Sequence, residues 1–175
     1  TNILAAGPVD LEQVRLSANW MAASGVNGED EALFDTVGAV TDLCRMLRIA
    51  IPVGKDSLSM RTAWQDHGAP KSVVAPVSLI VSAFAPVADV RRVLTPQLRT
   101  EAESFVYLLD LGAGRNRLGG SCLAQVYGIV GGRGPDLDEP QRVRQLYACL
   151  ADLRQRGLVL AYHDRSDGGL FVTLC

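Results

Sequence analysis

Two stretches of the chain repeat apolar residues every three or four positions, which is the spacing of an amphipathic α-helix. The first begins near Asp30, and the second begins at Pro140 and stops before Gly157, with Arg154 and Arg156 at its carboxyl end. We expect each helix to bury its apolar stripe, the first helix against a sheet. The two stripes consist of Leu33, Val37, Val40, Cys44 and Leu47, and of Val143, Leu146, Tyr147, Leu150 and Leu153.

Five apolar runs have the composition of strands, either β-branched or alternating with polar residues. Pro76 and Pro86 lie near the ends of the longest run, so we predict one buried strand with a bend there. Between the second and third runs, residues 63–72 contain Gly68 and Pro70 and are predicted to form a surface loop that exposes His67. The five predicted strands span residues 14–20, 49–53, 73–87, 105–109 and 158–162.

Shorter segments complete the pattern. Residues 2–6 stop at Gly7 and Pro8 and are predicted to be the last turns of a helix. Residues 88–94 and 123–129 are predicted to be short helices. Residues 95–100 break the periodicity, so we expect a boundary between two subdomains there.

The composition narrows the class of protein. The 175 residues are 48% apolar and 21% charged, with a formal net charge of −2, as in an ordinary globular protein. No basic stretch or aromatic platform suggests nucleic acid, and no apolar run is long enough to cross a membrane. We therefore expect no nucleic-acid or membrane partner, a cytoplasmic location, and, because the chain starts at Thr1, an internal piece of a longer protein.

The four cysteines are scattered, without the paired spacing of a metal site or a redox motif. They lie mostly within apolar patterns, so we predict buried, reduced thiols. The two histidines, His67 and His163, are far apart in the sequence, which argues against zinc. The cysteines are Cys44, Cys122, Cys149 and Cys175.

Residues 162–170 form a polar, glycine-containing segment between two apolar runs. Gly168 and Gly169 allow close approach of a ligand to the backbone, and Ser166 or Asp167 is predicted to cap a helix whose first N–H groups would face a phosphate. Asp164, at the end of the preceding run, is a candidate ligand of Mg²⁺. The alternative is a capped turn with no ligand.

Two further loops are candidate ligand sites. Gly54 is followed by Lys55, Asp56 and Ser57 at the predicted end of a strand, where a cation and a hydroxyl together suit a phosphate. A solvated turn is the alternative. Residues 112–121 are rich in glycine but match neither the P-loop nor the dinucleotide-binding pattern, so we predict a close-packed turn between a strand and a helix.

Five motifs occur here in the order found in the large bacterial type of phosphoribosylformylglycinamidine synthase, which the chain resembles over essentially its full length. The resemblance implies an ATP-dependent ligase that uses glutamine as its ammonia source and converts formylglycinamide ribonucleotide to the amidine in purine biosynthesis. The partners implied are these substrates and the remainder of the parent chain, including a glutaminase domain. The motifs are residues 16–21, 51–60, 94–98, 123–127 and 162–170.

The resemblance also implies a fold. The synthetase region of the family is α+β and similar to aminoimidazole ribonucleotide synthetase, with a first-type α/β domain followed by a second-type α/β domain. Residues 1–96 resemble the later part of the first type, and residues 97–175 the beginning of the second type.

The cofactors implied by the resemblance are ATP and Mg²⁺. Carried over residue by residue, the family's metal ligands include Asn2 and Asp164, and Ser166 contacts the nucleotide. His163 of the same motif joins Lys55, Asp56 and Ser57 as further candidate ligand residues. We assign no catalytic residue within the chain, and we expect the isolated chain to make no amidine, because the family's other metal ligands and its glutaminase lie outside it.

Two alternatives remain open. One is a structural half of the same enzyme that holds ADP and Mg²⁺ without turnover. The other is a related small-molecule kinase, such as a selenophosphate or thiamine-phosphate kinase, although the motifs at residues 16–20 and 54–57 favour the synthetase.

Overall fold

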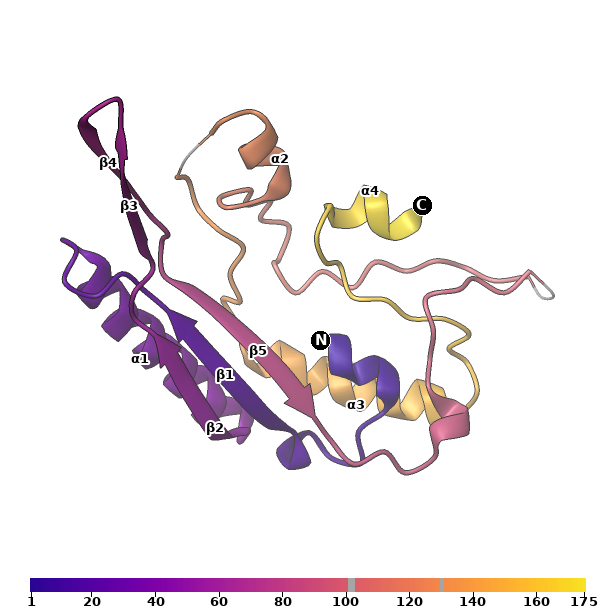
Figure 1. Cartoon of the computed structure of the whole chain (residues 1–175). Coiled ribbons are helices and arrows are strands. Elements are labelled where there is room, and N and C mark those ends of the chain that lie inside the picture. The colour runs from indigo at the N-terminus through magenta and orange to yellow at the C-terminus, as the bar shows by residue number, and fades with distance from the viewer. Residues whose placement is uncertain (101–102, 130) are drawn as a thin grey trace. The chain divides into compact units, whose positions relative to one another are not determined.

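The computed structural model describes residues 1–100, 103–129 and 131–175 (Figure 1). These residues form two compact units: one is Val9–Pro86, and the other joins Thr1–Pro8 to Val87–Cys175. Helices and small sheets occur together, which is compatible with the predicted α+β class. The arrangement of aminoimidazole ribonucleotide synthetase and the domain boundary between residues 96 and 97 stay predictions.

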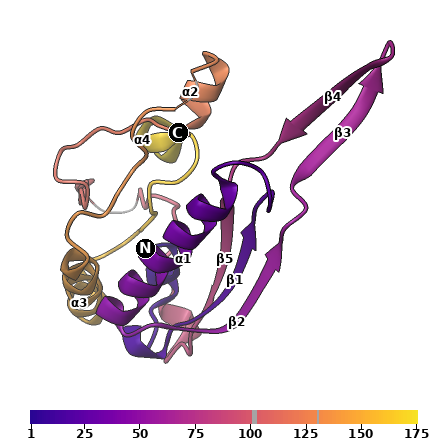
Figure 2. The same cartoon turned by 90° about the vertical axis from the view of Figure 1, so that its left-hand side faces the viewer.

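The unit Val9–Pro86 contains a three-stranded sheet in the order β2-β1-β5. The central strand β1 (Arg15–Met21) is parallel to β2 (Ala50–Ser57) and antiparallel to β5 (Ser78–Phe84). Helix α1 (Glu29–Leu47) connects β1 to β2 and lies along one side of the sheet (Figure 2). The predicted strands at residues 14–20 and 49–53 and the predicted first helix are therefore confirmed, with β2 longer than expected.

The charges at the ends of α1 match its dipole. Its first turn contains Glu29, Asp30 and Glu31, and its last turn contains Arg45. Leu47 is buried, whereas Val37 of the same stripe is 40% exposed. The core of this unit sits around β1 and its flanking turns, where buried apolar residues are Leu11, Val14, Ala18, Ala22 and Ala23.

A two-stranded antiparallel ribbon replaces the loop predicted at residues 63–72. It consists of β3 (Arg61–Asp66) and β4 (Ala69–Val74), joined by His67 and Gly68 at φ 49° and 83°. Positive φ at both turn residues is the type I′ geometry, whose twist matches that of paired strands. The loop prediction was wrong, although His67 is exposed as expected.

The single buried strand predicted at residues 73–87 was also wrong. Strand β4 ends at Val74 and β5 begins at Ser78, with Pro76 between them, where its missing N–H interrupts strand pairing. Both strands are mostly exposed, including Val73 and Ile80 at 57% each. An apolar run does not guarantee burial when no second layer covers it.

The main helix described in the other unit is α3 (Gln141–Gln155). It buries Leu146 and Leu150 as predicted. Residues 2–6 form a 3₁₀ helix, η1 (Asn2–Ala6), ended by Gly7 at φ 69°. Further short helices are η3 (Val90–Arg92), α2 (Cys122–Val126) and α4 (Gly169–Leu174), while Leu11–Gln13 (η2) belongs to the first unit. The helix predicted at 123–129 is thus shorter than expected, because Gly128 takes φ 64°.

Two predicted strands of this unit are not strands. Residues 105–109 and 158–162 pair with no described strand. The side chains of the first segment are exposed, from 55% for Leu109 to 80% for Tyr107. A segment with strand-forming residues becomes a strand only when it pairs with another strand, and the described residues supply no such partner here.

The cysteines are free, but their predicted burial was wrong for three of them. Cys44 is half-buried, and its burial raises the pKa of its thiol. Cys122, Cys149 and Cys175 are exposed, two of them in or next to short helices that bury little.

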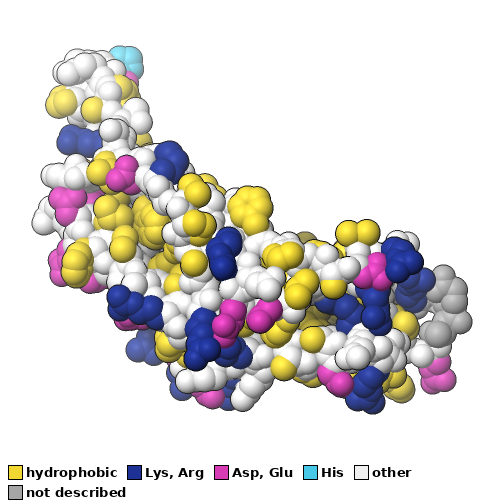
Figure 3. Space-filling model, turned by 90° about the horizontal axis from the view of Figure 1, so that it is seen from below, with side chains coloured by type: hydrophobic (Ala, Val, Ile, Leu, Met, Phe, Trp, Pro, Cys, Tyr) yellow, Lys and Arg dark blue, Asp and Glu magenta, His cyan; other side chains and the backbone are white. Residues whose placement is uncertain are grey.

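Apolar side chains likewise reach the surface on the face shown in Figure 3. No helix within the described ranges is long and apolar enough to cross a membrane.

Candidate functional site

Asn2 and Asp164 lie side by side although 162 positions separate them in the sequence. The amide Nδ2 of Asn2 donates a hydrogen bond to Oδ1 of Asp164 at 3.0 Å. The hydroxyl of Ser166 donates to the other carboxylate oxygen, Oδ2, also at 3.0 Å. The structure therefore brings together the two predicted metal ligands and the predicted nucleotide-binding serine.

Tyr162 fixes the segment that leads to Asp164. Its backbone N–H donates to the carbonyl oxygen of Thr95 at 3.0 Å, and its hydroxyl donates to the carbonyl oxygen of Thr1 at 3.2 Å. Asn2 begins η1, so the second bond holds the start of that helix beside residues 162–164. The Asp164 side chain is only 16% exposed in this arrangement.

The carboxyl group of Asp164 stays ionised. Burial alone would raise its pKa, but hydrogen bonds from Asn2 and Ser166 and the nearby His163 together outweigh burial and lower the pKa below the ordinary value. Burial, followed by the charge of Asp164, raises the pKa of the Tyr162 phenol. The site is therefore a partly buried negative charge with a neutral amide and a hydroxyl around it.

His163 lies at the edge of this group. Its Nδ1 contacts the backbone carbonyl oxygen of Asp164 and is 3.9 Å from Oδ1 of the same residue. Its side chain is 40% exposed. The imidazole is therefore positioned by the turn and remains accessible from solvent.

The predicted helix cap was wrong. Helix α4 begins after Gly168, at φ 85°, and no side chain caps it. Ser166 is bonded to Asp164 instead, and an added Cβ on Gly168 would lie 2.7 Å from Cγ2 of Val172. The glycine is needed for the close approach of the chain to the first turn of its own helix.

The donor set suits a hard cation. Carboxylate and amide oxygens are ligands that Mg²⁺ accepts, and this ion commonly uses one or two protein groups beside phosphate and water oxygens. Asp164 and Asn2 provide one group of each kind. No cluster of three or more His, Cys, Asp or Glu suited to a metal occurs among residues 1–100, 103–129 and 131–175.

Lys55, Asp56 and Ser57 belong to the other compact unit and lie within β2, so the predicted turn at residues 54–57 was wrong. The extended backbone pairs these residues with Asn19, Trp20 and Met21 of β1. Side chains alternate between the faces of a strand, so Lys55 and Ser57 share one face while Asp56 lies on the other. The ammonium of Lys55 donates to Ser57 Oγ at 3.0 Å and to Asn19 Oδ1 at 3.4 Å.

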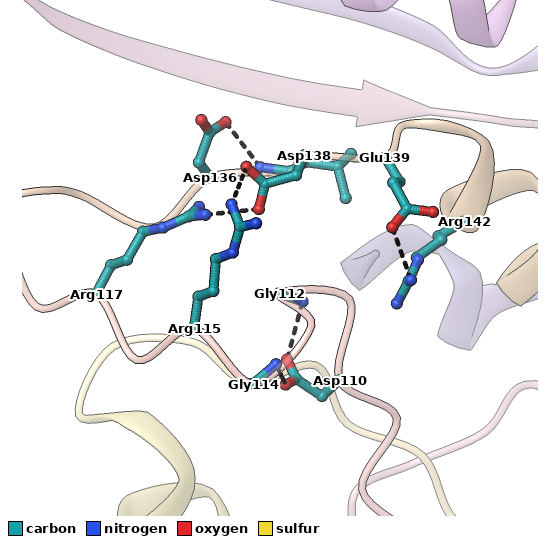
Figure 4. Close-up of polar contacts among 10 residues, drawn as sticks. Asp110, Gly112, Gly114, Arg115, Arg117, Asp136, Asp138, Glu139 and Arg142 are labelled. Carbon is teal, nitrogen blue, oxygen red and sulfur yellow. Dashed lines mark hydrogen bonds and ion pairs between the residues drawn. The ribbon is translucent and has the colours of Figure 1, made fainter.

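The glycine-rich segment 112–121 is a tightly bonded turn (Figure 4). The carboxylate of Asp110 accepts from the N–H groups of Gly112 at 2.9 Å and Gly114 at 2.6 Å. An added Cβ on Gly119 would lie 2.6 Å from backbone atoms of residues 132–133, which confirms the predicted close packing. Its end leads into α2, where Ser121 accepts from the N–H of Ala124 at 3.1 Å.

Arginines near the same turn pair with carboxylates. Arg115 and Arg117 contact the two carboxylate oxygens of Asp138 at 3.1 and 2.5 Å, and Arg142 pairs with Glu139 at 2.7 Å (Figure 4). Hydrogen bonding by Arg117 is the main cause that lowers the pKa of Asp138. Each of these three arginines therefore has a carboxylate partner, and Arg115 and Arg117 share one.

Two residues of these sites were missed from the sequence. Tyr162 was treated as part of a strand, and Asn19 was quoted within a motif without a role. The contact between Asn19 and Lys55 depends on the register between β1 and β2. The alternating pattern of residues 14–18 indicates a strand, but it contains no signal for that register.

Residues 1–86 match a family model described as the FGAR-AT PurM_N-like domain. The matched stretch contains Asn2, Asn19 and the segment at Lys55. The match supports a relationship of this stretch to the FGAR amidotransferase and PurM family.

Proposed function

We propose that the chain serves in the synthetase region of an FGAR amidotransferase, where residues Asn2, Asp164 and Ser166 hold a nucleotide with Mg²⁺. The match of residues 1–86 supports the family, and the contact between Asn2 and Asp164 supports the position of the site. This contact is the observation that most favours a ligand site over a capped turn, because it joins two distant segments through their side chains.

The proposed reaction forms a C–N bond. The amide oxygen of formylglycinamide ribonucleotide takes the γ-phosphoryl group of ATP, and ADP leaves. Ammonia released from glutamine then adds to the amide carbon, and phosphate leaves with that oxygen to give the amidine. The residues of this chain are proposed to bind and orient the nucleotide, and no proton transfer is assigned to them.

Each polar side chain has a separate task in this proposal. Asp164 supplies the negative charge, and Asn2 supplies an amide oxygen while its N–H fixes the carboxylate. Ser166 is bonded to Asp164 and is proposed to contact a nucleotide phosphate. Mg²⁺ held by the oxygens of Asp164 and Asn2 would neutralise the charge of the nucleotide phosphates.

The substitution Asp164→Asn tests the role of the charge. A carboxylate that only accepts a hydrogen bond is replaced by an amide at a cost of about 1 kcal/mol or less, whereas a Mg²⁺ ligand loses its charge. In a full-length synthetase containing this segment, we expect at least about a tenfold loss of Mg²⁺-dependent ADP affinity with an unchanged melting temperature. Asn2→Ala should weaken ADP binding in the same direction.

Asp167→Asn is the matched control, because this exposed carboxylate lies three positions away in the same segment. It should retain the ADP affinity of the unaltered enzyme. Loss of stability with full ADP binding in Asp164→Asn would assign the carboxylate to structure alone and would overturn the proposed site.

A further inference from the structure

Lys55 is a cation without a carboxylate partner among the residues that the structure describes. The other lysine of the chain, Lys71, pairs with Asp66 across the β3–β4 ribbon. The Lys55 ammonium instead donates to three neutral oxygens: Ser57 Oγ at 3.0 Å, the Asp56 carbonyl at 3.1 Å and Asn19 Oδ1 at 3.4 Å. Its three donors are thus directed by the protein, while its charge remains uncompensated.

The direction of these hydrogen bonds leaves the N–H and O–H donors of Asn19 and Ser57 available beside the cation. Asn19 accepts through its carbonyl oxygen, so both N–H bonds of its amide remain for another acceptor. Ser57 also accepts from Lys55, which leaves its own O–H to donate elsewhere. The carboxylate of Asp56 lies on the opposite face of the strand. A positive charge with two neighbouring donors is complementary to an anion.

The backbone that supports this group is a sheet and not a loop. Asn19 is opposite Lys55, and Met21 is opposite Ser57, in the parallel pairing of β1 and β2. Lys55 is exposed, while Asn19 and Ser57 are half-buried, so a ligand can reach the group although two of its members are held by packing. Binding groups on paired strands need little reorganisation when a ligand arrives.

We propose that Lys55, Asn19 and Ser57 form a binding site for a phosphate group. The site lies in the unit Val9–Pro86, whereas Asp164 belongs to the other unit. Lysine suits phosphate as a point charge, and the amide and hydroxyl donate to its remaining oxygens. The identity of the ligand rests on the proposed function: the phosphate belongs either to the ribonucleotide substrate or to a nucleotide.

The two lysines provide an internal comparison for the test. In the chain labelled with ¹³C-lysine, the ε-methylene groups of Lys55 and Lys71 give two NMR signals, which Lys71→Met assigns. Inorganic phosphate, ribose 5-phosphate and ADP without metal are added separately at constant ionic strength. We expect the Lys55 signal to shift and saturate, and the Lys71 signal to stay in place. Stronger binding of ribose 5-phosphate than ADP would identify the sugar phosphate as the ligand, and the reverse would identify the nucleotide.

Asn19→Asp is the decisive variant, because it places a carboxylate beside Lys55 with almost no change in shape. We expect at least about a tenfold loss of phosphate affinity, since the new ion pair neutralises the cation. Equal shifts of both lysine signals, or unchanged affinity in Asn19→Asp, would overturn the proposed site.

Failure here is distinguishable from failure of the proposed function. The lysine signals report the unit Val9–Pro86, whereas ADP affinity in Asp164→Asn reports the other unit. If ADP binding depends on Asp164 and the Lys55 signal does not respond, only the phosphate site is wrong. If Lys55 responds and ADP binding is independent of Asp164, only the nucleotide site is wrong.

Discussion

Asp110 orders a turn through charge-assisted hydrogen bonds. The N–H groups of Gly114 and Gly112 are the main causes that lower the pKa of this carboxyl, and Arg165 and Arg142 contribute in the same direction. A carboxyl with a lowered folded pKa stabilises the folded state above the unfolded value of about 3.9, and this stabilisation is lost as pH falls through the folded pKa. The turn should therefore loosen only in strong acid.

The amide resonances of Gly112 and Gly114 report the loosening of this turn as the pH falls. Followed by NMR through the acid range, both should move together with a midpoint below the ordinary Asp value. Asp110→Asn should abolish the transition while leaving the resonances of the buried α3 residues Leu146 and Leu150 unchanged. A midpoint at or above the ordinary value would contradict the role of these two hydrogen bonds.

Sequence and structure agree best at the residue scale where neighbours are close along the chain. The bond from Ser166 to Asp164 spans two positions, and the motif containing both predicted a polar site. The contact of Asn2 with Asp164 could be anticipated only through a family resemblance, because residue types alone contain no signal for a pairing across 162 positions. Asn19 was missed for the same reason, since its partner is set by strand register.

At the scale of elements, the β3–β4 ribbon depends on its two-residue turn. Gly68 has φ 83° with open space where a Cβ would stand, so Gly68→Ala tests backbone strain alone. We expect a loss of about 1–2 kcal/mol of ribbon stability, because L-residues disfavour this conformation. His67, at φ 49°, should gain stability when replaced by Asn, which tolerates positive φ.

Cross-strand amide exchange measures ribbon stability without requiring the whole chain to unfold. Protection of the paired residues in β3 and β4 should fall in Gly68→Ala and rise in His67→Asn. Gly38→Ala in α1 is a suitable control, because it also meets open space but has helical geometry and should leave the ribbon unchanged. Equal protection in all three variants would show that the turn does not limit ribbon stability.

Helices were predicted better than strands for a physical reason. The stripes of α1 and α3 are local patterns, and each helix satisfies its backbone internally, so both were located closely. A strand needs a partner from elsewhere in the chain. Residues 14–20 have two such partners and form β1, whereas residues 105–109 have a similar composition and no described partner.

At the scale of the molecule, Arg154 joins the two sequence segments of its unit. Its guanidinium donates to the carbonyl oxygens of Leu4 at 2.6 Å and Ala5 at 3.1 Å, which also accept from the backbone N–H groups of Gly7 and Leu94. Burial, followed by repulsion from Arg92, lowers the pKa of this arginine. Arg154→Met should therefore destabilise the unit containing η1 and α3 by about 1–3 kcal/mol.

The aromatic residues allow this effect to be assigned to one unit. Trp20 and Trp64 lie in the unit Val9–Pro86, and all four tyrosines lie in the other. In urea, the tyrosine near-ultraviolet signal of Arg154→Met should be lost earlier and the tryptophan transition should be unchanged. Arg156→Met is the control, since its exposed ion pair with Asp152 is worth about 0.5 kcal/mol or less. A shifted tryptophan transition, or equal effects of both variants, would contradict the assignment.

The same bond imposes an order on biosynthesis. Leu4 and its partner Arg154 are separated by 150 positions, so a ribosome adding roughly 5–20 residues per second completes the second about 8–30 s after the first. Residues 9–86 emerge in full during this interval and can fold before the second segment of the other unit, Val87–Cys175, is complete. Until then residues 1–8 can contact Val87 and Leu94 through their backbone but lack the bonds from Arg154. This incomplete anchoring makes them a natural target for a chaperone that recognises short apolar peptides on the nascent chain.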